Sequence, residues 1–345
     1  MQKAFGKVLR VAISFALAGG LLWLFARNLD FAKVGAALRG AHPAWLAASV
    51  VVSVLGIPVR SWRWTRLIRH VGTVTQLEAF SATCIGFAAT TLLPARAGEV
   101  VKPVALSRTS RLPLPPLLAS VALERLIDLV CIVALFVVYA LGGWAPAGVG
   151  GEAGSNFVIL RRSALIAGGG TLVAIVLLAL LSTRPALHDR LMGPFLRLLP
   201  HSLGAKVGAL LRSFLEGFGS LRTAHASGAV ALSSACLWLV ICAQIHAGLL
   251  AFDLSFPFPV SFFVLTWSVL GLAIPTPGGV GGYHAAVAYG LTAFYAVAPA
   301  TAAAFALAQH AIGFVPITIL GLGFLAAGGL SLGSLKEEAV DPGTR

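Results

Sequence analysis

Five charged residues stand inside hydrophobic stretches of the chain, where ions are costly. Arg96 and Glu99 lie three residues apart at a break in one stretch, and the next stretch carries Glu124, Arg125 and Asp128. Glu124 and Asp128 are four residues apart, so a helix presents both carboxylates on one face. An ion at membrane depth costs roughly 2.5 to 3.5 kcal/mol, so each should face a partner or a polar cavity. The spacing predicts two ion pairs, Arg96 with Glu124 or Asp128, and Arg125 with Glu99.

This charged cluster has two interpretations, which do not exclude one another. It is an ionic lock that fixes the break onto the following helix, or it binds a charged lipid head group. In the second case the arginines grip a phosphate in a bidentate way and the carboxylates meet a cationic group. Substrate-binding roles are therefore expected for Arg96, Glu99, Glu124, Arg125 and Asp128.

A second hydrophobic stretch is broken at residues 274–282, where two prolines and four glycines gather. Glycine lets main-chain N–H groups approach a ligand closely, and the following helix presents the positive end of its dipole there. We expect Gly278, Gly279, Gly281 and the adjacent His284 to contact an anionic group. A tight turn at a hairpin tip would have the same composition.

A cluster of arginine and tryptophan follows the hydrophobic stretch at 43–60. It comprises Arg60, Trp62, Arg63 and Trp64. Such clusters are typical of the membrane–water interface, where the rings and guanidinium groups contact lipid head groups. We interpret these four residues as interface anchors.

The composition is that of an integral membrane protein. Hydrophobic residues make up 58% of the chain, charged residues 11%, and the mean hydropathy is +0.91, which excludes an ordinary soluble domain. The four cysteines lie in apolar segments without a CxxC spacing, so we expect inert thiols and no metal site. The net charge of +13 comes mainly from cations clustered in alternate loops, which indicates membrane orientation rather than a nucleic-acid surface.

The hydrophobic segments predict the fold class. A membrane-crossing helix needs about 20 apolar residues, and the regions 75–107 and 259–297 are long enough for two crossings but contain the breaks. Each is predicted to be a re-entrant helical hairpin. The expected fold is all-α and polytopic, with two such hairpins and about six full spans. The spans are predicted at 8–25, 43–60, 117–142, 163–182, 226–252 and 299–330.

Charge predicts the topology. Most of the 25 Lys and Arg residues fall on one side when both termini are cytoplasmic. Residues 43–142 and 226–330 then form two units of span, hairpin and span with opposite orientation, an inverted repeat. A cytoplasmic amphipathic connector, 183–225, joins them. The membrane domain covers 1–330, residues 331–345 form a flexible cytoplasmic tail, and the expected location is the bacterial inner membrane.

Four motifs in this order resemble a known family. They are Arg63-Trp64, then Pro94-x-Arg96-x-Gly98-Glu99, then Glu124-Arg125-x-x-Asp128, then Pro277-Gly278-Gly279-x-Gly281. The chain resembles the transmembrane, flippase-like domain of lysylphosphatidylglycerol synthases over roughly residues 8–330. The resemblance implies lipid flipping by a stand-alone member without the soluble aminoacyltransferase domain, so synthase activity is not implied. The family often has a glutamate where this chain has His284, so no carboxylate role is carried over there.

The expected function is binding and translocation of an amphiphilic lipid between leaflets. The lipid would be a phospholipid, an aminoacyl lipid, a glycolipid or an isoprenoid or hopanoid lipid. The alternatives are a non-transporting partner that presents lipid to a biosynthetic enzyme, and a lipid-modifying enzyme that uses Glu124 or Asp128 as acid or base. With no convincing catalytic constellation, we expect a transporter-like protein and not an enzyme. Membrane lipids are its expected partners, with no cofactor and no nucleic acid.

Overall fold

The computed structural model describes residues 2–93, 96–144, 152–183, 204, 207–208 and 224–335. Every regular element in this part of the chain is helical, which confirms the all-α prediction. The predicted connector at 183–225 and the tail beyond 335 lie almost entirely outside the described residues. The elements are α1 (Gln2–Ala26), α2 (Phe31–Gly40), α3 (Pro43–Leu67), α4 (Gln76–Leu92), α5 (Gly98–Ser110), α6 (Leu114–Leu141), α7 (Glu152–Thr183), α10 (Ala224–Ala251), α11 (Val260–Leu272), the 3₁₀ turn η2 (Pro277–Gly279), α12 (Gly282–Tyr295) and α13 (Pro299–Ala327).

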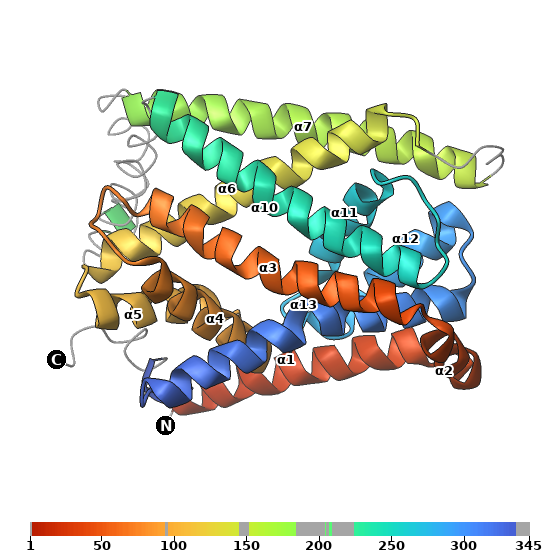
Figure 1. The fold of residues 1–345 in the computed structure, drawn as a ribbon, viewed down its shortest axis with the longest axis horizontal. Helices are drawn as coiled ribbons and strands as arrows, with labels where there is room; N and C mark the ends of the chain where they lie inside the picture. Colours follow the sequence, from red (N-terminus) through yellow and green to blue (C-terminus); the bar gives the residue numbers. More distant parts are fainter. Residues whose placement is uncertain are drawn as a thin grey trace.

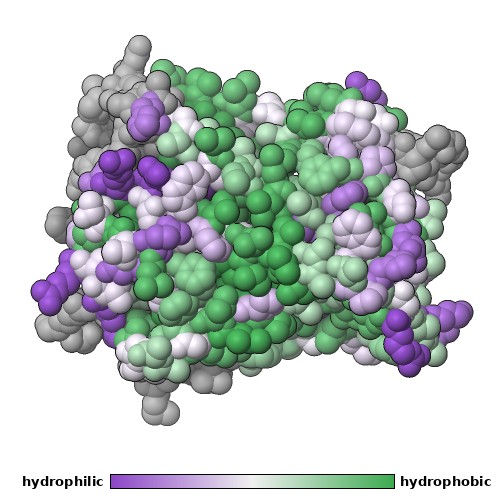
Figure 2. Space-filling view, in the orientation of Figure 1, coloured by the Kyte–Doolittle hydropathy of each residue, from purple (hydrophilic) through white to green (hydrophobic). Residues whose placement is uncertain are grey.

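The long helices make this a multi-pass membrane protein. Four stretches within the described residues are long and apolar enough to cross a bilayer, and the helices α1 and α2, bent by 86°, would together make a fifth. The helices run along the long axis of the molecule (Figure 1), with hydrophobic residues across its middle and hydrophilic ones toward both ends (Figure 2). The four stretches are Pro43–Leu67, Ser155–Leu178, Ser227–Ala251 and Pro299–Ala327.

These stretches coincide with four of the six predicted spans. The predicted span 8–25 lies in α1, one arm of the bent pair, and 117–142 lies in α6. Helix α6 is 28 residues long. Its three charged residues, Glu124, Arg125 and Asp128, keep it out of the set of helices that are apolar enough to be counted as membrane-crossing. The full count of six spans stays a prediction.

Both broken regions fold into pairs of short helices. Helices α5, α11 and α12 have 13, 13 and 14 residues, or about 20 Å each at 1.5 Å per residue, too short to cross a bilayer alone. A capping box starts α4, where the Thr75 hydroxyl accepts the Glu78 N–H and the Glu78 carboxylate accepts the Thr75 N–H. We call the pair α4–α5 the first hairpin and the pair α11–α12 the second hairpin.

Within each hairpin the main chains touch through glycine. A Cβ added at Gly98 would overlap the carbonyl oxygen of Gly86, and a Cβ added at Gly282 would lie 2.6 Å from that of Gly271. Gly98 and Gly282 are each the first residue of the second helix of their hairpin. The two hairpins therefore close in the same way.

The hairpins lie in opposite halves of the bundle and meet at their tips. In Figure 1 the first hairpin occupies the end where α1 begins and α13 ends, and the second occupies the other end. A Cβ at Gly278 would lie 3.4 Å from the Thr91 carbonyl oxygen. Helices α3 and α10, which begin the two predicted repeats, pack along each other. Membrane re-entry and the inverted repeat stay predictions that this geometry accommodates.

Candidate functional site

Two carboxylates on α6 form the centre of a buried ion cluster. Glu124 is fully buried and Asp128 is 4% exposed. Arg63 of α3 reaches both, with Nη2 donating to Glu124 Oε1 at 2.9 Å and Nη1 donating to Asp128 Oδ1 at 2.6 Å. Lys102 of α5 donates from Nζ to the second oxygen of Glu124 at 2.6 Å. One carboxylate pair thus ties α3, α5 and α6 together.

The predicted ion pairs differ from these contacts. Arg96 does not reach Glu124 or Asp128. It faces Glu99 on its own turn, with 3.8 Å between Nε and Oε1, at an exposed site. Arg125 does not pair with Glu99 but approaches Asp128 Oδ2 at 3.2 Å. The prediction was wrong because α3 and α5 had already supplied cations to these carboxylates.

Arg63 and Trp64 are not interface anchors. Both are fully buried. The Trp64 indole N–H donates to the Ser120 hydroxyl at 3.0 Å, and Lys102 Nζ lies 4.0 Å from the centre of its ring. Their contacts with α5 and α6 replace any contact with lipid head groups. Lys102 of α5 is likewise buried.

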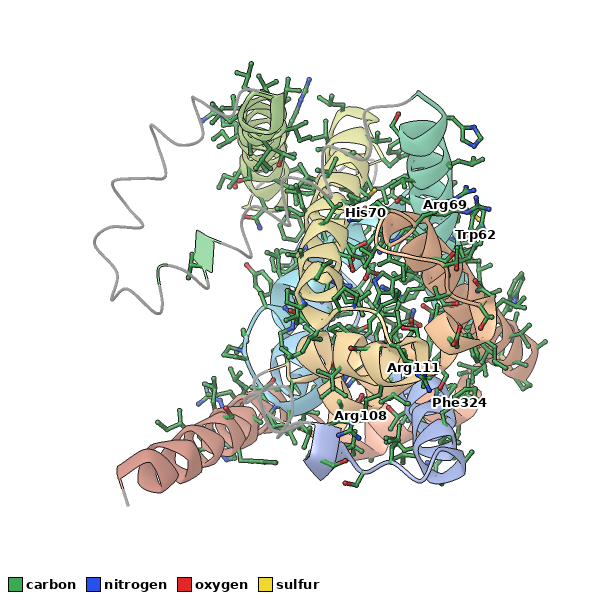
Figure 3. The ribbon with its side chains drawn as sticks, turned by 90° about the vertical axis from the view of Figure 1, so that its left-hand side faces the viewer. Trp62, Arg69, His70, Arg108, Arg111 and Phe324 are labelled. Atoms are coloured by element: carbon green, nitrogen blue, oxygen red, sulfur yellow. The ribbon has the colours of Figure 1, made fainter. Side chains whose placement is uncertain are left out.

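Arg60 and Trp62, the other two residues of the arginine–tryptophan cluster, do not contact the buried carboxylates. Arg60 lies with its guanidinium 5.0 Å from the centre of the Phe87 ring and lines a cavity. Trp62 lies under the guanidinium of Arg66. Figure 3 shows Trp62 at the end of the bundle that also presents Arg69, Arg108 and Arg111. Interface anchoring at Trp62 stays a prediction.

A cavity of about 310 Å³ lies where the hairpin tips meet. Arg96, Gly98 and Glu99 line it from the first break, and Gly278 and Gly279 line it from the second. The cavity joins the two breaks that the sequence singled out separately. Its other charged lining residues are Arg60, Lys102, Arg125 and Asp128.

Several polar groups of the cavity wall lack a hydrogen-bond partner within the described protein. They are Arg125 Nε, Asp128 Oδ2, Trp238 Nε1, Thr276 Oγ1 and Gln309 Oε1, all of them buried. Buried polar atoms are normally paired, so these five are donors and acceptors available to water or to a ligand. Arg96 adds backbone strain at the same place, since its φ of 53° costs a non-glycine residue about 1 to 2 kcal/mol.

The main chain of the second break forms hydrogen bonds within the break itself. Gly278, Gly279 and Gly281 have φ of 59°, 74° and 85°, which only glycine adopts readily. The Gly279 N–H donates to the Thr276 carbonyl and the Gly281 N–H donates to His284 Nδ1. The break therefore does not offer the open row of N–H donors that its glycines predicted.

The four predicted residues of this break divide between two environments. Gly278 and Gly279 line the cavity. Gly281 packs against α1, where a Cβ would lie 2.7 Å from Leu21 Cβ. His284 is buried against His310, with 3.0 Å between His284 Nε2 and His310 Nδ1. Neither Gly281 nor His284 lines the cavity.

No group of three histidine, cysteine, aspartate or glutamate side chains within the described ranges is arranged to hold a metal ion. The charged residues of the cavity are instead mixed in sign, with four cations against two carboxylates among its lining residues. The excess of cations over carboxylates on this lining suits an anionic group.

Comparison with known proteins adds two findings. Residues 9–321 match the family described as the lysylphosphatidylglycerol synthase TM region. A curated relative named Glycosyltransferase AglD, from Haloferax volcanii, is 27% identical over 345 residues, covering 94% of this chain and 55% of the relative. The chain therefore spans about half the length of that relative.

The relative's name overturns the expectation that the protein is not an enzyme, because a similar chain carries the name of a glycosyltransferase. The motif argument behind that expectation was also incomplete. Gly329, Ser331 and Gly333 form a GxSxG sequence. The Ser331 hydroxyl accepts the Ser334 N–H at 3.1 Å, and the segment follows a helix rather than the strand of a nucleophile elbow.

Proposed function

Since the chain belongs to the lysylphosphatidylglycerol synthase transmembrane family, we propose that it binds an amphiphilic lipid in the cavity between the two breaks and moves it between leaflets. The observation that carries the proposal is the cavity itself, which brings charged residues of the first hairpin and the tip of the second into one space. Transporters with discontinuous helices bind their substrates at such places.

The head group that fits this cavity is anionic. Arg63 and Lys102 are occupied by Glu124 and Asp128, whereas Arg125 is 40% exposed at its side chain and keeps an unpartnered Nε. Arg125 and Arg60 are the cations that we propose for a phosphate, because charge-assisted hydrogen bonds from guanidinium to phosphate are strong and directional. Arg96 and Glu99 would meet the head group as it enters.

Both earlier interpretations of the charged cluster then apply, to different residues. Glu124 and Asp128 act as the lock, held by Arg63 and Lys102, and they keep Arg125 in position through its contact with Asp128 at 3.2 Å. Gly278 and Gly279 would form the opposite wall. The acyl chains would lie along apolar side chains of α10, α11 and α13 that line the same cavity, namely Leu237, Ile241, Val269, Phe314 and Ile317.

The test is lipid movement in vesicles that contain the purified full chain. Fluorescent phosphatidylglycerol in the inner leaflet should become accessible to a membrane-impermeant quencher, and fluorescent phosphatidylcholine should do so more slowly. Arg125→Gln should slow phosphatidylglycerol movement about 10- to 100-fold, the loss of one or two charge-assisted bonds. Arg66→Gln, a change outside the cavity on α3, should leave the rate unchanged.

Equal rates for wild type and Arg125→Gln would remove Arg125 from the head-group site. Movement of neither lipid, nor of isoprenoid phosphates, by a correctly folded protein would refute translocation.

In the proposed topology both termini lie in the cytoplasm of a bacterial cell. Labelling of single cysteines at Ser110 and Asp253 from opposite sides of the membrane tests this topology.

A second candidate function is favoured by the name of the Haloferax volcanii relative. In this case the cavity would hold a lipid acceptor for glycosyl transfer, either presented to a separate enzyme or modified by this protein. Membranes that contain the protein, supplied with nucleotide sugars, would then accumulate lipids heavier by one sugar unit. Mass spectrometry of extracted lipids separates this outcome from movement of unmodified lipid.

A further inference from the structure

Two histidines close the second break through a chain of hydrogen bonds. His310 Nε2 lies 2.8 Å from the Gly278 carbonyl oxygen, His310 Nδ1 lies 3.0 Å from His284 Nε2, and His284 Nδ1 lies 3.3 Å from the Gly281 nitrogen. The chain begins and ends on main-chain atoms of the break. It connects α12 and α13 across two side chains that are 5% and 9% exposed.

The partners at the two ends determine where the protons lie. A carbonyl oxygen only accepts, so His310 Nε2 carries a proton and donates it to Gly278. A main-chain N–H only donates, so His284 Nδ1 is bare and accepts from Gly281. The neutral ring of His284 then carries its proton on Nε2, which donates to the bare Nδ1 of His310. Both imidazoles are neutral, and each uses its bare Nδ1 as an acceptor.

One added proton breaks this chain. A proton on His284 Nδ1 sets two donors against each other at Gly281, and a proton on His310 Nδ1 sets two donors against each other between the rings. If His284 changes to its other tautomer, its Nε2 can accept from His310 Nδ1. Its own Nδ1 then carries a proton that faces the Gly281 N–H, so two donors still oppose each other. The closed form of the break and the protonated form of the pair therefore exclude one another.

Few other titratable groups face the pair. Tyr283 stacks on His310 with ring centres 4.8 Å apart, and Phe25 and Phe314 cover the remaining ring faces. Residues 12–26 of α1, which include its contacts with the break at Leu21 and Phe25, contain no titratable residue, and neither does α11. The cations of α1 are Lys3, Lys7 and Arg10, at least 11 residues before Leu21. The other titratable residues of α12 and α13 are Tyr289 and Tyr295, one or more turns away along α12.

The remaining neighbours of α12, α13 and η2 hold their charged groups away from the pair. Helix α4 meets the break at Thr91, 13 residues from Glu78 and about 20 Å along the helix. Its other titratable residue is Cys84, which packs against Gly321 of α13. Helix α7 meets α12 at Phe157 and Phe294, and Arg161 and Arg162 on it are exposed.

Helices α2, α3 and α10 also pack on α13. Their titratable groups are Lys33 and Arg39 on α2, Arg60, Arg63 and Arg66 on α3, and His225, Cys236, Cys242 and His246 on α10. Arg60 lines the cavity that Gly278 also lines. A cation on that wall favours the neutral form of the pair until an anionic ligand offsets it.

We propose that the His284–His310 pair is a proton-binding latch: the neutral pair holds the second break closed, and a proton taken up by the pair releases it. The release is a property of the break alone. Its use as the coupling step of lipid movement rests on the function proposed above.

Hydrogen exchange of the full chain in lipid nanodiscs, without added substrate, tests the latch. After correction for the intrinsic pH dependence of exchange, amides of residues 278–284 should lose protection on acidification from pH 8 to pH 4. One coupled proton allows a change of up to about tenfold per pH unit. Helices α3 and α10 should keep their protection.

His310→Gln keeps a donor for Gly278 and an acceptor for His284 but does not titrate. His284→Gln does the same from the other side. Either change should abolish the pH response of residues 278–284. The control is His246→Gln, which replaces a histidine of α10 that takes no part in these hydrogen bonds, and it should retain the response. A thermal unfolding scan of each variant confirms that it is folded.

The latch is refuted if wild-type 278–284 exchanges equally at both ends of the pH range, a result that does not depend on any variant. It is also refuted if the response persists in His310→Gln and in His284→Gln. The two proposals fail separately. A pH-dependent break in a protein that moves no lipid refutes the function alone, and lipid movement with a pH-independent break refutes the latch alone.

Discussion

Arg63→Met is the most informative test of the charged cluster. Arg63 is fully buried and donates to two carboxylates at 2.6 and 2.9 Å. Its removal leaves Glu124 with Lys102 and leaves Asp128 with Arg125. Breaking a buried charge pair typically costs about 3 to 5 kcal/mol, most of it the penalty of a buried charge that has lost its partner. We therefore expect the free energy of unfolding to fall by about that amount.

The assay is reversible unfolding in mixed micelles, followed by helical circular dichroism. In a Glu124→Gln/Asp128→Asn background the same substitution should cost about 2 kcal/mol less, because the carboxylates that suffer from its loss are then neutral. Arg66→Met is the matched control one turn further along α3. The Arg66 guanidinium lies 5.2 Å from the centre of the Trp62 ring, an interaction worth about 0.5 to 1 kcal/mol.

A cost for Arg63→Met below about 1 kcal/mol, the range of exposed ion pairs, would refute the reasoning. So would an equal cost in the neutralised background, because the loss would then come from packing and not from charge.

Two further substitutions test the elements around the cavity. Gly98→Ala would drive a methyl group into the Gly86 carbonyl, so it should lower the unfolding free energy by about 1 to 3 kcal/mol or more. Gly35→Ala, inside α2, meets no atom within 4 Å and should raise the unfolding free energy by up to about 1 kcal/mol in the same assay, because alanine is the better helix former. Trp64→Phe removes the bond to Ser120 and leaves a smaller ring in a buried site. Its cost should be about 1 kcal/mol lower in a Ser120→Ala background, the part that belongs to the hydrogen bond.

The sequence predicted the positions of the hairpins because proline and glycine mark where a helix cannot continue. The region 75–107 contains α4 and all of α5 but its last three residues, and 259–297 encloses α11 and α12. Glu124 and Asp128 were identified because their spacing puts two costly ions on one helical face. These predictions rested on local information, which a single sequence contains.

The partners of those carboxylates required information that no local pattern contains. The apolar stretch at 43–60 predicted that α3 ends near Arg60, but the helix continues to Leu67 and carries Arg63 to α6. Lys102 lies within the hairpin predicted at 75–107, but its contact with Glu124 of α6 joins two helices and has no local pattern. One signal was present: two buried carboxylates need cations, and Lys102 lies one turn after Glu99.

The glycine contacts inside the hairpins also limit how the protein can move. Gly86 meets Gly98, and Gly271 meets Gly282, with the main chain of one helix close to the main chain of the other. Neither glycine of a pair has a side chain that could change rotamer and let one helix slide past its partner. Each hairpin is therefore stiff where its two helices touch. Any opening of the cavity must separate the hairpin tips, with the bending confined to the breaks at the tips and to the segments that join each hairpin to the long helices.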